Sequence, residues 1–158
     1  MDDQLDPGDL YWRAVDPYWA EVSIYDGAAV LGRDLAQIPP GSANLLCAHW
    51  CQSEVRNGGF HQFFYNSTGV LAPEAVAGFY AIGMPTCAWL IEEAMKFFGD
   101  PYPRERQSRI EVLKPYDIQD PDQEDPFGSL DDRFYEVVDS ENGGFLSAAD
   151  QYAAGLTS

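Results

Sequence analysis

Basic residues are scarce in this chain, and their scarcity excludes several classes of function. The 158 residues include 9 Lys and Arg against 26 Asp and Glu, so the formal net charge is −17 at pH 7. A surface of that sign repels nucleic acid and anionic membranes, and it attracts basic partners over distances set by the Debye length. We therefore expect no direct binding of nucleic acid and no membrane association, although strong acidity also serves solubility alone.

Cysteine is scarce as well. The chain has three, at positions 47, 51 and 87. An odd number of cysteines does not make a disulfide framework, and the acidic start of the chain is unlike a basic, apolar targeting sequence. We therefore expect reduced, buried thiols and a cytoplasmic location.

The pattern Cys47-x-His49-x-Cys51 invites comparison with a metal site. On a helix, Cys47 and Cys51 share one face while His49 points away from it. Three ligands at this spacing on a single helix do not surround a zinc ion, and a closed tetrahedral site needs a fourth ligand. We predict core cysteines, no metal site and no cofactor.

Long hydrophobic runs are absent apart from residues 75–91, which carry no charge. The run is at the lower limit of length for a membrane-spanning helix, and Gly83 and Pro85 interrupt it. No basic residue flanks it on either side as an anchor. We predict two buried helices that separate near Gly83 and Pro85.

Catalytic motifs are also missing, since the chain has no nucleophile elbow, phosphate-binding glycine loop, dinucleotide-binding glycine pattern or H-E-x-x-H zinc motif. Glu54 and His61 form the one pair that suggests a general base. No nucleophile or third orienting group accompanies this pair. We interpret the chain as non-enzymatic, and an enzyme that uses Glu54 and His61 remains as an alternative.

What the sequence does contain is apolar residues at helical spacing and no segment that alternates as a strand does. The pattern predicts an all-α fold, a single globular multi-helix domain over 1–158 with short connections. We expect residues 1–8 to be flexible and residues 115–128 to form an acidic loop that contains proline. The predicted helices cover 30–38, 43–56, 60–66, 73–82, 85–98, 103–113, 129–138 and 145–156, with an interrupted helix over 12–22.

A corner is predicted at Asn57-Gly58-Gly59-Phe60, because glycine tolerates the backbone geometry that ends a helix. Glu54 continues the apolar stripe of the preceding helix, so we expect it to be at least half buried. Its carboxylate is predicted to accept hydrogen bonds from the free backbone N–H groups at the start of the next helix.

The acidic residues are concentrated at the two ends of the chain. Residues 1–26 carry a net charge of −6 and residues 117–158 a net charge of −10, whereas residues 27–116 are nearly neutral. Ser129 and Asp132 form a capping-box pattern, which places Asp131 and Asp132 in the first turn of a helix. Residues 120–125 lack the central glycine and the final glutamate of a calcium loop. We expect a solvated loop or a docking surface for a basic partner there.

The central run of the chain resembles the signature of a bacterial DNA-mimic protein family, otherwise a domain of unknown function. The matching residues are His49-Trp50-Cys51-Gln52-Ser53-Glu54-Val55-Arg56-Asn57-Gly58-Gly59-Phe60-His61-Gln62-Phe63-Phe64-Tyr65-Asn66-Ser67-Thr68-Gly69. The helices over 75–83 and 88–98 and the run 131–135 look similar too. The resemblance implies an all-α domain, often a homodimer, whose best-known member occupies the DNA-binding face of a helix-turn-helix transcription factor. It implies function by analogy only.

The sequence thus predicts an acidic interaction protein that binds a basic DNA-binding protein or transcription factor as a DNA mimic. The alternative is an immunity-type or regulatory binding domain that uses an apolar surface or a cleft. We expect carboxylates of both ends to gather on one face, with the partner-binding set Asp117, Asp120, Asp122, Glu124, Asp125, Asp131, Asp132, Glu136 and Asp139. The structural motif is predicted to comprise Glu54, Asn57, Gly58, Gly59, Phe60, Gln62, Phe63 and Asn66.

Overall fold

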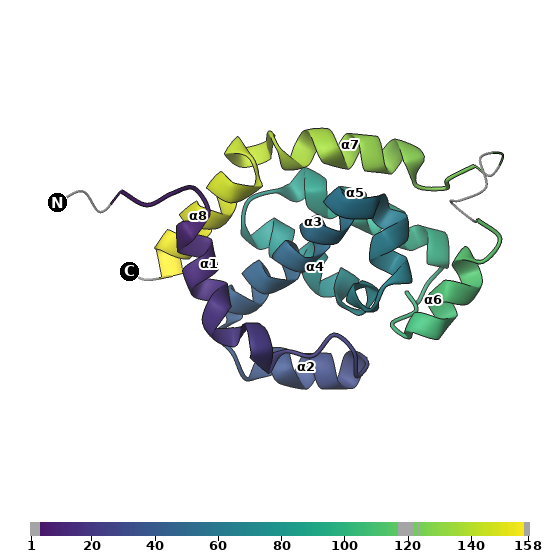
Figure 1. The fold of residues 1–158 in the computed structure, drawn as a ribbon, viewed down its shortest axis with the longest axis horizontal. Coiled ribbons are helices and arrows are strands. Elements are labelled where there is room, and N and C mark those ends of the chain that lie inside the picture. The colour runs from purple at the N-terminus through teal and green to yellow at the C-terminus, as the bar shows by residue number, and fades with distance from the viewer. Residues whose placement is uncertain (1–3, 117–121, 123, 157–158) are drawn as a thin grey trace.

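The structure is a computed structural model that describes residues 4–116, 122 and 124–156 (Figure 1). Within those residues all regular structure is helical, as the apolar spacing predicts. The elements are α1 Asp9–Val15, η1 Asp16–Glu21, α2 Ala28–Ala36, α3 Pro40–Tyr65, η2 Ser67–Leu71, α4 Ala72–Ala81, α5 Pro85–Met95, η3 Lys96–Phe98, α6 Arg106–Leu113, α7 Gly128–Val138, η4 Glu141–Gly143 and α8 Phe145–Leu156, where η marks a 3₁₀ helix.

Helix α3 forms the centre of the fold, because it packs against α1, α4, α6, α7 and α8. Its phenylalanines Phe60, Phe63 and Phe64 are fully buried in a single apolar cluster that takes side chains from every α-helix. Helix α7 lies along one edge of the molecule and α2 along the opposite edge, while α1 and α8 lie side by side at one end (Figure 1).

The uncharged run 75–91 divides as predicted into the end of α4 and the start of α5, with Gly83 at φ +79° between them. Pro85 opens α5, where its missing N–H group costs no hydrogen bond. Among the described helices, none is long and apolar enough to span a bilayer.

The three cysteines are buried, as predicted. Burial raises the pKa of the Cys47 and Cys87 thiols well above their usual range, so these groups stay protonated. His49 lies among the rings of Trp12, Trp19 and Trp50, and burial lowers the pKa of its imidazole. No cluster of potential metal ligands occurs among the residues that the structure describes.

Two local predictions near the chain ends need correction. Helix α7 begins at Gly128 without a side-chain cap, and the carboxylate of Asp125 instead accepts a hydrogen bond from the Phe127 N–H group at 2.9 Å. Gly8, expected in a flexible end, is buried and donates its N–H group to Asp150 on α8 at 2.6 Å. The described part of the predicted loop 115–128 has no helix before Gly128.

Candidate functional site

Asp132 and Glu136 on the exposed face of α7 and Asp139, the residue that caps its end, form one row of exposed carboxylates, which we call the α7 stripe. Their spacing of four and then three residues places them on the same side of the helix. The first and last residues of the stripe are seven positions apart, and a rise of 1.5 Å per position gives a length of about 10.5 Å. The stripe is therefore a short, straight array of negative charge along one helix.

The acidic surface continues before the helix through Asp122, Glu124 and Asp125, which are all exposed. Asp117 and Asp120 lie outside the described residues. Arg133 is exposed on α7 as well, so one positive charge lies beside the stripe. Arg56 on α3 forms an ion pair with Asp139 at 2.9 Å and neutralises that end of the stripe in part.

The prediction that Asp131 belongs to the partner-binding surface is wrong, because the exposed fraction of this residue is 8%. Its carboxylate accepts a hydrogen bond from the Phe60 N–H group at 2.8 Å, just after the break that Gly58 and Gly59 make in α3. Asp131 therefore performs the bracing that we predicted for Glu54. Removal from water raises the pKa of Asp131 to about 6, although the hydrogen bond from Phe60 lowers it and nearby carboxylates raise it.

Glu54 is half buried, but its carboxylate meets side chains and not the backbone. It accepts hydrogen bonds from the amide of Gln62 at 2.7 Å and from the amide of Asn66 at 3.1 Å. His61 instead stacks on Tyr65, with ring centroids 6.1 Å apart. The motif residues of the corner are thus held together by hydrogen bonds between the two halves of α3.

The carboxylates of the two chain ends do not form one array. Glu141 accepts hydrogen bonds from the N–H groups of Thr86 and Cys87 at the start of α5, and Asp150 accepts those of Gly8 and Tyr11 at the start of α1. The acidic residues of η1 lie between α1 and α2, at the edge of the molecule away from α7 (Figure 1). Helix starts carry partial positive charge, so Glu141 and Asp150 stabilise the helix starts that they contact.

The pKa of Asp131 predicts how stability depends on pH. The folded state raises this pKa above the ordinary 3.8, so protonation of Asp131 favours the folded state. This contribution to stability is fully present below pH 3.8. The contribution disappears as the pH rises through about 6, and it amounts to about 2–3 kcal/mol. Asp131→Asn keeps an acceptor for Phe60 without the charge. We expect the variant to lose this fall in stability between pH 4 and 7 in urea denaturation, whereas exposed Asp132→Asn should retain it.

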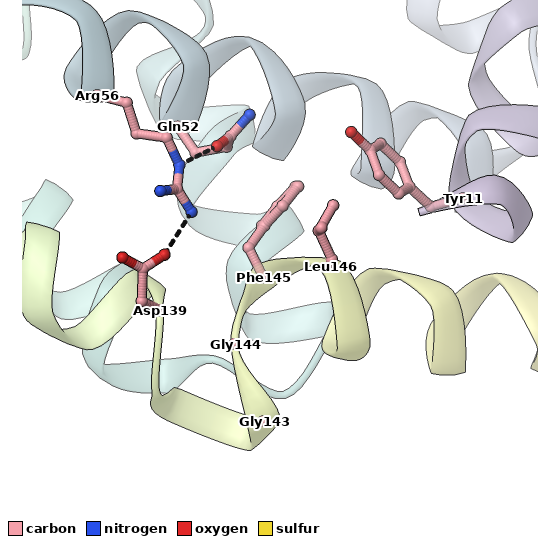
Figure 2. A pocket seen from close by; sticks show the side chains of 8 residues that line it. All are labelled: Tyr11, Gln52, Arg56, Asp139, Gly143, Gly144, Phe145 and Leu146. Carbon is pink, nitrogen blue, oxygen red and sulfur yellow. Dashed lines mark hydrogen bonds and ion pairs between the residues drawn. The ribbon is translucent and has the colours of Figure 1, made fainter. Parts of the chain in front are cut away.

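A cleft of about 440 Å³ adjoins the end of the stripe. Figure 2 shows Arg56 reaching towards Asp139 on one side, with Phe145 and Leu146 rising from the start of α8 and Tyr11 beyond them. Arg56 also donates from Nε to Gln52 at 2.5 Å. Asp139 therefore belongs both to the α7 stripe and to the wall of this cleft. Nothing in the sequence indicates this cleft, because its walls come from α1, α3, the α7–α8 connection and the start of α8.

A protein-family model described as DMP19-like protein matches residues 36–155, which is about three quarters of the chain. The match includes the glycine corner of α3, the α7 stripe and most of the cleft. Comparison with curated proteins and with solved structures gives no match.

Proposed function

The chain belongs to the DMP19-like protein family, the DNA-mimic family that its central motif resembles, and we propose that it occupies the DNA-binding face of a basic protein. The α7 stripe is the observation that carries this proposal. Its carboxylates are exposed, lie in one row and project from a helix that packs on α3 and α5. The role is binding and not catalysis.

Charge density supports the mimicry. One strand of duplex DNA carries one phosphate per 3.4 Å of axis, so a length of about 10.5 Å spans about four phosphates. The stripe offers three carboxylates over the same length, one of them paired with Arg56. Asp122, Glu124 and Asp125 are exposed and add negative charge before its first residue, which strengthens the attraction of a basic partner.

A regulatory binding domain that uses a cleft is the second candidate function, and the cleft beside Arg56 favours it. The two candidates differ in the residues that matter. Mimicry depends on the exposed carboxylates of α7, whereas cleft binding depends on the apolar wall made by Phe145 and Leu146.

Affinity capture with two charge-matched variants tests the proposed function. The immobilised chain should retain a DNA-binding protein from lysate of its source at about 50 mM salt and release it by about 200 mM. The double variant Asp132→Asn/Glu136→Gln should release that protein at lower salt. Asp16→Asn/Glu21→Gln removes the same charge from exposed positions of η1 and should behave as the native chain does. If the captured protein elutes from both variants at the same salt concentration, binding depends on the net charge of the chain and not on the position of the carboxylates. The proposal would then fail.

A further inference from the structure

Three hollows share lining residues, and together we call them the α3 row. Two of them are lined by α3, and the third is lined by residues 5–10, Gly143 and the start of α8. The central one is the cleft of about 440 Å³ described above. It shares Gln52 and Arg56 with a hollow of about 480 Å³ that reaches Glu54 and Gln62. It shares Gly143 and Leu146 with a third hollow, of about 470 Å³, that reaches Leu5 and Leu10. The shared residues make the hollows neighbours, with more polar walls in the hollow at Glu54 and more apolar walls in the hollow at Leu5 and Leu146.

The charges along the α3 row select the sign of an occupant. Its walls include the carboxylates of Glu54, Asp139, Asp6 and Asp150 against the single guanidinium of Arg56. Arg56 already donates to Gln52 and to Asp139. Glu54 and Asp150 accept hydrogen bonds from neutral groups, which leaves their negative charge in place. An anionic occupant would face the net negative wall, and a second copy of this chain would bring a further charge of −17. The row therefore fits a cationic occupant.

The apolar end of the row indicates that the occupant also carries an apolar side chain. Leu5 is 40% exposed and Leu146 is 46% exposed, and both line the third hollow beside the partly buried Leu10. Exposed leucines that gather at a hollow offer an apolar side chain a place to leave water. A basic segment with one apolar side chain thus meets complementary walls along the α3 row.

We propose that the α3 row binds a basic segment of a protein partner, with an apolar side chain of that segment anchored at Leu5, Leu10 and Leu146. The inference rests on the proposed function, because Asp139 joins the row to the α7 stripe and one basic partner can contact both. The stripe takes the DNA-binding face of that partner, and the row takes a neighbouring segment of it. Recognition of an apolar anchor supplies a specificity that phosphate-like charge alone does not give.

Two synthetic peptides provide the test, one with Arg-Leu-Arg and one with Arg-Ser-Arg between the same flanking glycines. Fluorescence anisotropy should show the leucine peptide binding about tenfold more tightly, as burial of one leucine predicts. Leu146→Ser should remove this preference. Leu156→Ser changes an equally exposed leucine outside the row and should keep it. Asp139→Asn should weaken both peptides and reduce their dependence on salt.

Amide chemical shifts locate the bound peptide. The leucine peptide should move the signals of Gly143, Gly144 and Leu146. Equal affinity of the two peptides, an unchanged preference in Leu146→Ser, or shifts confined to α7 would overturn the proposal, as would inorganic phosphate competing with the peptide at Arg56. If Asp132→Asn/Glu136→Gln weakens capture of the DNA-binding protein while Leu146→Ser does not, the inference fails and the proposed function stands. If neither variant matters, both fail.

Discussion

An Arg109→Met variant is expected to lose about 3–5 kcal/mol of unfolding free energy. The Arg109 side chain is completely buried on α6 and is held by backbone carbonyls. Its Nε donates to Phe64 at 2.9 Å and its Nη2 to Asn66 at 3.1 Å, at the end of α3, where carbonyl groups lack helical partners. Its Nη1 donates to the carbonyls of Pro103 and Arg104 at 3.2 and 2.6 Å. Methionine would leave these buried acceptors without donors.

Thermal unfolding by circular dichroism measures this effect, which corresponds to a decrease in Tm of about 6–20 °C. Arg109→Lys retains a charge but cannot donate in the same planar arrangement, so it should be destabilised as well. Arg106→Ala provides the control, since Arg106 is exposed and contacts the Tyr65 carbonyl and ring. It should cost less than about 1 kcal/mol. Similar losses in Arg106→Ala and Arg109→Met would contradict the role given to Arg109.

Gly59→Ala is expected to destabilise the fold by about 3 kcal/mol or more. Gly59 has φ +74° and ψ −178°, a conformation that is almost restricted to glycine and strains other residues by about 1–3 kcal/mol. A Cβ atom at this position would also lie 2.5 Å from the Asp131 carboxylate. That carboxylate must then move away from Phe60, and the bracing of the corner is lost. Chemical denaturation monitored by tryptophan fluorescence measures the loss.

Gly32→Ala is the matched substitution. Gly32 lies within α2, and a Cβ atom there meets nothing within 4 Å. Alanine should therefore stabilise α2 by up to about 1 kcal/mol, because it is the better helix former. Opposite signs at Gly59 and Gly32 are the expected result. A tolerated alanine at Gly59 would show that the corner does not depend on its left-handed backbone.

Helices and their breaks were predictable from the sequence because they depend on local spacing. The run 75–91 separated at Gly83 and Pro85, and Gly58-Gly59 interrupted α3, because the backbone preference of glycine and proline can be read from the sequence. The partner of the corner was not predictable. Asp131 lies 71 residues from Phe60, and the capping-box pattern of its own segment suggested a different, local role.

Arg109 shows the same limit in another form. Nothing near it in the sequence marks a buried residue, since its helix is short and charged and its partners are carbonyl groups that every residue possesses. Burial of its guanidinium lowers its pKa, yet the carbonyls keep the charge satisfied. A charged residue is expected to be exposed on average. That expectation fails for Arg109, which binds the free carbonyl groups at the end of α3.

The acidic surface was predictable in amount but not in arrangement. Counting acids located the surplus at the chain ends, whereas only the fold divides it between structure and surface. Asp131, Glu141 and Asp150 contact N–H groups at helix breaks or starts contributed by distant segments. Asp132, Glu136 and Asp139 remain exposed in one row. The residues that we propose for partner binding are among those that the helix starts do not use.

Competition with duplex DNA tests the central claim most directly. With the captured basic protein and its labelled DNA site, increasing amounts of this chain should displace the DNA completely, in a manner that excess DNA reverses. The Asp132→Asn/Glu136→Gln variant should need about tenfold or more protein for the same displacement. Formation of a ternary complex, in which the partner holds DNA and this chain together, would contradict the claim that the carboxylates of α7 take the place of phosphates.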